Sequence, residues 1–495
     1  MSSLRRKTIS GVIWSASSKL ILQLVLLGVT ALLARLLSKD DFGVVGMAAI
    51  ITVAVNMVND KGLGTAIVQR KYLDSNHLSS LFWGSIAFGV FLYLLSAVIA
   101  VPMAQFFRKP VVSPVVLVMA LGFVIGSFGI VQKSLMTREM DFKRLSILEI
   151  FSVLPAGLAA VIMAKAGFGV WSLVANSVLR DLFNVAGLWI VHPWRPRRHF
   201  SWKEFREYIG FSSKVLANDG AIYLITNTDV TIIGRVLGSA ALGVYNLALY
   251  LVKLPVTRIS AIVARVVFPA FSSLQDEPDK FGKAYLRATK YISLIAFPLL
   301  AILAVFSREI VLLVLGEKWI EMILPLIIMT PMGMLKSVGT IRDSVFMAVG
   351  KPQIELYWNI GYFFPLAAAV YLGTRWGVVG AASAFTLASI AAFPFIQHLT
   401  NKAAGISMKR FIGSISTAAI ATAVAAAAGW GALYAGRHLH LPLIARVTLG
   451  SIWMTGIYLL ILHSLEPEFL PEAKQILKEK DIKPVEYSFY DEVAS

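Results

Sequence analysis

The residues of this sequence most able to do chemistry are ionisable and amide side chains that lie inside apolar stretches. In the stretch near 211–234, Lys214, Asn218 and Asp229 fall within about 60° of one another on a helix that turns about 100° per residue, and Asp219 extends that arc. Charged groups are costly inside a membrane and usually face a water-filled path or each other. One side of this helix is therefore expected to face away from lipid.

Basic side chains recur at helical spacing in two other apolar stretches. Near 240–266, Arg258 and Arg265 lie seven residues apart and share one helix face, and Lys253 forms a second polar stripe with Asn246 by the same spacing. The candidate anion-binding residues are Lys19, Arg35, Lys214, Asn218, Lys253, Arg258 and Arg265. We expect these residues to line a central cationic cavity that accepts an anionic substrate.

Other interpretations of the same charges stay open. Lys214 and Arg265 lie near the ends of their stretches, where long side chains can reach the interface, and others could form structural ion pairs. Asp219 and Asp229 could instead bind a coupling cation or proton. Four further charged residues lie close to expected helix ends and are interpreted as interfacial: Glu149, Arg342, Asp343 and Glu355.

The composition argues against covalent catalysis and against a metal site. The chain has no cysteine, which excludes disulfides and thiol catalysis, and its seven histidines are scattered without ligand spacing inside a span. No paired carboxylates or Ser-His-Asp set emerges, and the short loops leave little room for a catalytic domain. We therefore expect no catalytic residue, no metal site and no cofactor, and we expect that the protein is not an enzyme.

The elements that must position these residues are membrane-spanning helices. The sequence is 57% hydrophobic and 15% charged, with a mean hydropathy of +0.73, whereas soluble domains are about a quarter charged. Because a bilayer crossing needs about 20 apolar residues, we predict an all-α polytopic membrane protein of about fourteen helices. The expected spans lie near 11–37, 42–59, 79–101, 112–133, 146–165, 168–191, 211–234, 240–266, 288–314, 320–349, 355–373, 377–399, 411–434 and 442–464.

The basic residues between these spans alternate in number along the chain. Lys and Arg cluster in every second loop, for example within 192–206, while the intervening loops hold one or two each. Since basic residues are retained on the cytoplasmic side of short loops, both termini are predicted to be cytoplasmic. The net charge of +18 resides in these loops rather than in one basic face, so nucleic-acid binding is not expected.

An internal repeat divides the chain into two halves. The segment ARLLSKDDFGVVGMA at Ala34 resembles GRVLGSAALGVYNLA at Gly234, an offset of 200 that superimposes Gly43 on Gly243. Parallel repeats are a transporter design with the substrate site between the two halves. We predict an N-terminal lobe of six helices at 1–200, a C-terminal lobe of six helices at 201–404, two further helices at 405–465 and a cytoplasmic tail at 466–495.

Several stretches resemble one family of membrane transporters. They include GLGTAIVQRK at Gly62, LMTREMDFKRLSILE at Leu135, RVVFPAFSSLQDE at Arg265 and LGEKWIEMILPL at Leu315. The chain resembles the Wzx-type polysaccharide flippases of the multidrug/oligosaccharidyl-lipid/polysaccharide exporter superfamily, in the branch of colanic-acid-type and teichuronic-acid-type exporters. The resemblance runs from the first expected span to the eleventh.

The resemblance implies export of an undecaprenyl-diphosphate-linked oligosaccharide repeat unit between the leaflets of the bacterial cytoplasmic membrane. It also implies membrane lipids, a polysaccharide polymerase and glycosyltransferases as candidate partners. Arginines of the first, second and eighth helices matter in related lipid II flippases; here the second span has no interior arginine. Two alternatives remain: a multidrug or cation antiporter of the same superfamily, which usually has an acidic cavity, and a membrane-embedded polysaccharide polymerase or acyltransferase.

Overall fold

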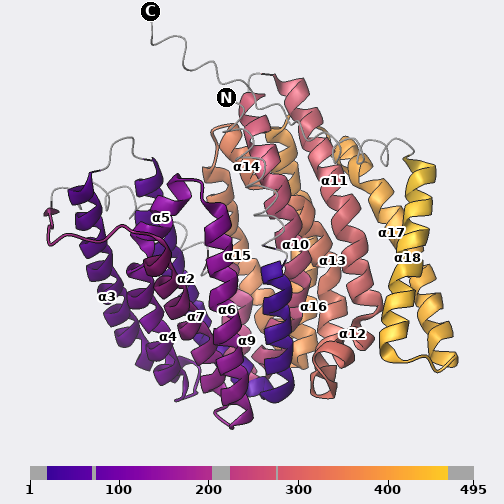
Figure 1. Cartoon of the computed structure of the whole chain (residues 1–495). Coiled ribbons are helices and arrows are strands. Elements are labelled where there is room, and N and C mark those ends of the chain that lie inside the picture. Colours follow the sequence, from indigo (N-terminus) through magenta and orange to yellow (C-terminus); the bar gives the residue numbers. More distant parts are fainter. Residues whose placement is uncertain are drawn as a thin grey trace, which may run out of the picture.

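The computed structural model describes residues 19, 21–69, 74–202, 223, 225–274 and 277–466. Within these ranges the backbone alone is described for 54–66, 68–69, 258–270, 272–273 and 278. The described chain is helical and contains no strand, which confirms the all-α prediction. Figure 1 shows the helices side by side in one bundle, with most of them running between the same two ends.

After an apolar helix at Ile21–Leu36, the described elements follow one another closely along the chain. They are α2 (Lys39–Gln69), α3 (Ser75–Phe106), α4 (Val112–Ser127), α5 (Ile130–Arg138), α6 (Phe142–Lys165), α7 (Val170–Val191), α9 (Thr228–Val236), α10 (Ser239–Ser273), α11 (Pro278–Val305), α12 (Ser307–Val314), the 3-10 helix η1 (Glu317–Met322), α13 (Ile323–Gly339), α14 (Arg342–Ala348), α15 (Gln353–Gly373), the 3-10 helix η2 (Thr374–Trp376), α16 (Gly377–Ala403), α17 (Met408–His438) and α18 (Leu443–Leu465).

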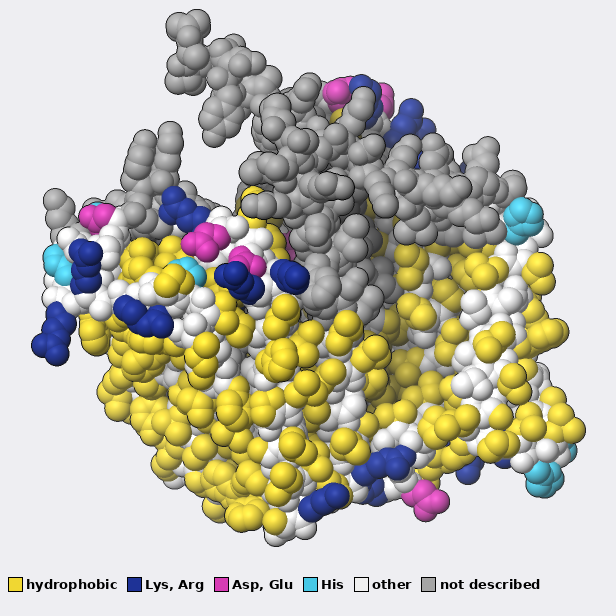
Figure 2. All heavy atoms as spheres, in the orientation of Figure 1, with side chains coloured by type: hydrophobic (Ala, Val, Ile, Leu, Met, Phe, Trp, Pro, Cys, Tyr) yellow, Lys and Arg dark blue, Asp and Glu magenta, His cyan; other side chains and the backbone are white. Residues whose placement is uncertain are grey.

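The exterior of the bundle is apolar, as a lipid-facing surface must be. Large side chains such as Val98, Ile190 and Trp430 are more than two thirds exposed. Figure 2 shows hydrophobic side chains over the middle of the visible face and Lys and Arg mainly toward its two ends. In lipid every backbone polar group must find its partner within the protein, which helices achieve internally. The protein is therefore a multi-pass membrane protein.

The helix boundaries refine the expected spans. Nine described helices are long and apolar enough to cross a bilayer, and a tenth crossing follows if α4 and α5, bent by 49° to each other, form one span. The number fourteen stays a prediction, and much of the span near 211–234 lies outside the described residues. The span expected near 288–314 is corrected: α11 already begins at Pro278, and a break at Phe306 separates it from α12.

Short polar residues begin several helices where the chain enters the bundle. The Asp74 carboxylate accepts hydrogen bonds from the backbone N–H groups of Asn76 and His77 and so caps α3. The pKa of Asp74 is lowered mainly by the hydrogen bond from the His77 backbone N–H group, and further by the hydrogen bond from the His77 side chain. Asp141 and Ser407 cap α6 and α17 in the same way. These caps satisfy helix-end donors at the surface of the bundle.

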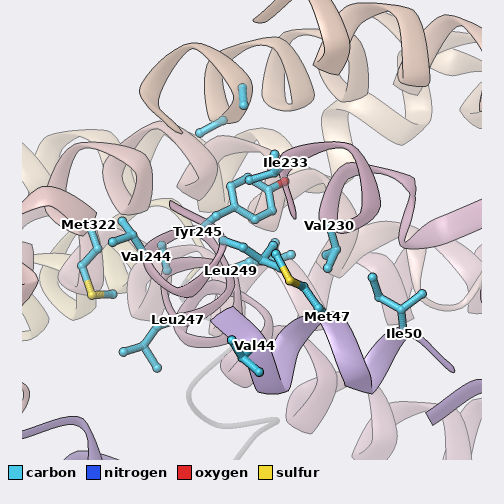
Figure 3. Packing of buried hydrophobic residues seen from close by; sticks show 14 of the residues in the cluster. Val44, Met47, Ile50, Val230, Ile233, Val244, Tyr245, Leu247, Leu249 and Met322 are labelled. Atoms are coloured by element: carbon cyan, nitrogen blue, oxygen red, sulfur yellow. The ribbon is translucent and has the colours of Figure 1, made fainter. Parts of the chain in front are cut away.

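The largest hydrophobic core joins the first half of the chain to the second along α2 and α10. Figure 3 shows Val44 and Met47 of α2 near Val244 and Tyr245 of α10, with Met322 of η1 on the α10 side. A second core gathers α11, α17 and α18. Figure 1 accordingly shows α17 and α18 at one side of the bundle, beyond α11.

The crossing of α2 and α10 is symmetric under the offset of 200 residues found in the sequence. A Cβ atom added at Gly43 would overlap the Ser239 carbonyl, and one added at Gly243 would overlap the Lys39 carbonyl. The two contacts exchange when 200 is added to one partner and subtracted from the other. Such close backbone approach requires glycine and brings two membrane helices into direct contact. The repeat therefore extends to equivalent contacts in three dimensions.

Candidate functional site

A cavity of about 620 Å³ lies within the second half of the chain, where α10, α13, α14, α15 and α16 meet. The residues of its wall that carry charge are Lys253, Lys336, Arg342, Asp343 and Glu355. Its volume falls in the range of about 300–1,000 Å³ that is typical of small-molecule sites. The cavity is larger than two others in the described chain, of about 340 and 480 Å³.

Two lysines face this cavity from different helices. Lys253 lies on α10 and Lys336 on α13, and the two ammonium groups are close enough to repel each other. The Lys336 Nζ atom lies 4.8 Å from the centre of the Phe385 ring, a contact that favours a cation. More than a third of the Lys336 side chain is exposed, although it lies deep within the protein, because its surface faces the cavity. Like charges held together in this way can bind an anion.

Carboxylates and an arginine gather at another part of the wall. The Arg342 Nη2 atom donates to Glu355 Oε1 at 3.3 Å, and both side chains are about one fifth exposed. Asp343 lies beside Glu355. Glu355 is seven residues before Tyr362 on α15, which places it about 10 Å nearer the amino-terminal end of that helix. The part of the wall formed by Arg342, Asp343 and Glu355 therefore offers both hydrogen-bond donors and acceptors.

One side of the cavity is aromatic. The rings of Trp358 and Tyr362, one turn apart on α15, are stacked with an interplanar angle of 9° and a centroid distance of 5.8 Å. Asn359 lies between them in sequence and also lines the cavity. The Tyr362 and Ser389 hydroxyl groups are 3.4 Å apart. An apolar platform thus adjoins hydrogen-bonding groups that can orient a ligand.

A buried carboxylate lies behind the lysines. Asp229 of α9 is 1% exposed, and its Oδ2 atom accepts a hydrogen bond from the Tyr245 hydroxyl at 2.6 Å. Its Oδ1 atom has no hydrogen-bond partner among the described residues. The negative charge of Asp229 acts on Lys336. Because burying a carboxylate without a partner is costly, the attraction between Asp229 and the Lys336 ammonium group helps to hold this arrangement together.

The two halves of the chain are tied together at the end of the bundle where α12 finishes. Arg35, in the last turn of the helix Ile21–Leu36, donates from Nε to the Val314 carbonyl at 3.0 Å and from Nη2 to the Leu313 carbonyl. The last carbonyls of a helix have no partner within it and attract cations. Arg35 therefore caps α12 across the interface.

The reverse contact comes from η1. Lys318 Nζ donates to the carbonyls of Arg35, at 2.9 Å, and of Leu37, and the Trp319 indole donates to the Ala34 carbonyl at 2.8 Å. Trp319 is fully buried. Each half of the chain thus caps a helix end of the other half. We call Arg35, Lys318 and Trp319 together the interlobe latch.

A smaller polar cavity of about 340 Å³ lies in the first half of the chain. It is bounded by the helix Ile21–Leu36 and by α5, α6 and α7, and its charged wall residues are Lys133, Glu149, Arg180 and Asp181. The Asp181 carboxylate also lies against Gly122, where an added Cβ would meet Oδ2 at 2.8 Å. This cavity holds as many acidic as basic side chains, so it does not favour an anion.

The structure separates the residues predicted for the anion site. Lys253 lines the large cavity, and Asp229 lies behind it. Arg35 lies in the interlobe latch instead, and Lys19 is exposed near the start of the first helix. The predicted residues that lie outside the described chain, or whose side chains do, are Lys214, Asn218, Asp219, Arg258 and Arg265.

Four charged residues of the cavity were not among the predicted site residues. Lys336 interrupts the apolar span expected near 320–349, and that interruption is a signal that the sequence offered. Arg342, Asp343 and Glu355 were interpreted as interfacial because they lie near helix ends. The structure shows that α14 and the first turn of α15 place them on the cavity wall. Among the described residues, no cluster of three His, Asp or Glu side chains could hold a metal ion.

Comparison with known proteins supports one family. The family model for "Polysaccharide biosynthesis protein" matches residues 32–324, more than half of the chain. The lipopolysaccharide biosynthesis protein WzxC of Escherichia coli (strain K12) is 29% identical over 78% of this chain and 80% of its own length. The teichuronic acid biosynthesis protein TuaB of Bacillus subtilis (strain 168) is 28% identical over 94% of this chain and 98% of its own.

The fold has a close counterpart among solved structures. The lipid II flippase MurJ in an inward closed conformation matches with a TM-score of 0.72 at 12% identity, covering 92% of this chain and 100% of that one. This likeness shows the fold, and the family model and the two relatives show the kinship. The chain belongs to the polysaccharide biosynthesis protein family of membrane proteins.

Proposed function

We propose that this protein moves an undecaprenyl-diphosphate-linked oligosaccharide repeat unit from the inner to the outer leaflet of the bacterial cytoplasmic membrane. The observation that carries the proposal is the cavity within the helix bundle that is lined by both Lys253 and Lys336, whose positive charges repel each other. A diphosphate with attached sugars cannot cross about 30 Å of hydrocarbon unaided. Two ammonium groups offer it charge-assisted hydrogen bonds in place of water.

The names of the relatives and of the structural neighbour also support a role in moving a lipid-linked saccharide. WzxC and TuaB are named for the biosynthesis of lipopolysaccharide and teichuronic acid, and MurJ is named a lipid II flippase. These names share a lipid-linked or surface saccharide, and the anionic diphosphate of such a lipid matches the two lysines of the cavity. A drug-cation antiporter would need an acidic cavity, whereas three basic side chains line this one against two acidic ones. Flipping requires no covalent step, so no catalytic residue is needed.

Alternating access is the mechanism that this arrangement favours. In our proposal the lobes at 1–200 and 201–404 rock relative to each other, and the interlobe latch holds them together at the end of the bundle where α2 and α10 cross. Breaking the latch opens that end and exposes the cargo to the other leaflet. The helices at 405–465 pack on the second lobe, and both termini lie in the cytoplasm. A polymerase and glycosyltransferases consume and supply the cargo.

The buried carboxylate gives the cycle a candidate coupling group. When an anion neutralises Lys336, Asp229 loses part of the charge that stabilises it. Its Oδ1 atom, which has no hydrogen-bond partner among the described residues, is then the place where a coupling ion can replace that charge. We propose that Asp229 links cargo binding to such an ion; the equivalent proposal for Asp219 rests on the sequence alone.

Depletion of the protein in its native host tests the proposed function. We expect surface polysaccharide to fall and undecaprenyl-diphosphate-linked oligosaccharide to accumulate in the cytoplasmic leaflet, where an externally added glycosidase cannot reach it. A Trp430→Ala copy should restore export, because this side chain faces lipid on α17. A Lys253→Gln, Lys336→Gln copy of equal abundance should not. Normal export by depleted cells would refute the proposal.

A further inference from the structure

The wall of the large cavity carries two kinds of charged group, and the proposed diphosphate accounts for only one of them. Lys253 and Lys336 suit an anion, whereas Asp343 and Glu355 repel one. If the whole cavity served a diphosphate, carboxylates on its wall would weaken binding. The carboxylates and the aromatic side chains therefore need another ligand chemistry.

The stacked rings of Trp358 and Tyr362 supply the first part of that chemistry. Both rings line the cavity and are stacked in parallel, with an interplanar angle of 9°, so α15 contributes an aromatic wall to the cavity. A pyranose ring has an apolar face of C–H groups that packs flat on such a wall, since aromatic rings present a large, slightly negative apolar surface. Lipid chains also pack on aromatic rings, but they have no use for adjacent hydrogen-bonding groups.

The polar groups beside the rings supply the second part. Sugar hydroxyls both donate and accept, so a sugar site needs acceptors as well as donors. Glu355 and Asp343 accept, Arg342 donates, and Asn359, next to Trp358 in the sequence, can do both. The Arg342 Nε atom is buried without a hydrogen-bond partner among the described residues, so one donor in this group is unused.

The lysines and the polar and aromatic groups of α14 and α15 line one cavity, so a single ligand that carries both chemistries can contact them together. Lys336 is close enough to Arg342 for their charges to interact. A diphosphate at the lysines can therefore have its attached sugar beside α15. At about 620 Å³ the cavity has room for a headgroup and not only for an isolated ion.

We infer that this cavity contains a sugar-binding subsite, formed by Trp358, Tyr362, Asn359 and the Arg342–Glu355 pair, which recognises the first sugar residues next to the diphosphate. The inference rests on the proposed function and deepens it. The lysines bind every lipid diphosphate, and the α15 wall selects those that carry a sugar. Cargo selection therefore resides in the second half of the chain.

Equilibrium binding with two radiolabelled lipids tests this division of labour in the purified full-length protein. The probes are undecaprenyl diphosphate and the lipid-linked oligosaccharide extracted from cells that lack this protein. Trp358→Ala should weaken binding of the oligosaccharide lipid about tenfold and leave that of undecaprenyl diphosphate within about twofold. Trp358→Phe should recover a large part of the loss, because it keeps an aromatic face. Lys336→Gln should weaken both lipids.

Trp430→Ala is the matched control, since it removes the same side chain from a lipid-facing position. An equal effect of Trp358→Ala on both lipids, or on neither, overturns the sugar-binding subsite while the proposed function stands. If the unaltered protein binds neither lipid, the proposed function itself fails. A melting temperature within about 2 °C of the unaltered protein shows that Trp358→Ala is folded.

Discussion

Removal of Arg35 probes the interlobe latch most directly. Its guanidinium makes two hydrogen bonds to the last carbonyls of α12, the Val314 bond at 3.0 Å. Hydrogen bonds to charged groups contribute about 1.5–3 kcal/mol when shielded, and a cation at a helix end adds about 0.3–1 kcal/mol. Because Arg35 is solvent-exposed, we take about 1–2 kcal/mol in total for Arg35→Ala. The ratio of opened to closed molecules should then rise roughly 5–30-fold.

Cysteine labelling measures this ratio, because the native chain contains no cysteine. Ser239 is 6% exposed beneath α2, so a Ser239→Cys side chain reacts with a water-soluble maleimide only after the α2–α10 crossing separates. The labelling rate is proportional to the opened fraction and should rise by the same 5–30-fold in the Arg35→Ala background. Arg375→Ala, which removes an exposed arginine from η2, should leave the rate within about twofold. An unchanged rate in Arg35→Ala would show that the latch does not hold the lobes.

Two further predictions concern other side-chain contacts of the described chain. The Ser239 hydroxyl donates a hydrogen bond to the Asp40 carboxylate, so an Asp40→Cys, Ser239→Cys pair should form a disulfide between the two lobes. This disulfide should stop export until a reductant is added. Export at full rate by the cross-linked protein would contradict alternating access. Arg437→Ala strips the 2% exposed Glu309 of its ion pair. Because Arg437 itself is 44% exposed, the loss of stability should be smaller than the about 3–5 kcal/mol of a fully buried pair; it is measured as a lower melting temperature in detergent, and an unchanged melting temperature would contradict this assignment.

Much of the fold could be predicted because membrane helices obey few rules. A span needs about 20 apolar residues, and this requirement located the described helices α3, α6, α7, α15 and α18 to within a few residues. Hydropathy shows which segments can face lipid, but it does not show where a helix changes direction. It therefore did not predict the bend between α4 and α5. It also missed the early start of α11, whose first turns lie beyond the apolar segment. The sequence repeat superimposes Gly43 on Gly243, and the structure shows that both glycines lie at the α2–α10 crossing.

The candidate site was predicted less well, because helical periodicity says which residues share a face but not what that face meets. Lys253 lies on a polar stripe and does line the cavity. Arg35 sits in an apolar span by hydropathy, yet it lies in the last turn and caps a helix 279 residues away. Glu355 was interpreted as interfacial because it is near a helix end, and only the packing of α14 shows that this end borders a cavity. Whether these residues bind cargo stays a prediction.

Reconstitution tests the central claim most directly. The purified protein is placed in vesicles whose inner leaflet carries a labelled undecaprenyl-diphosphate-linked oligosaccharide, and its arrival outside is followed with a membrane-impermeant glycan-binding lectin. The account predicts transfer well above that in protein-free vesicles, and a loss of at least about tenfold in Lys253→Gln, Lys336→Gln protein. Transfer no faster than in protein-free vesicles, or equal transfer by the double variant, would contradict it.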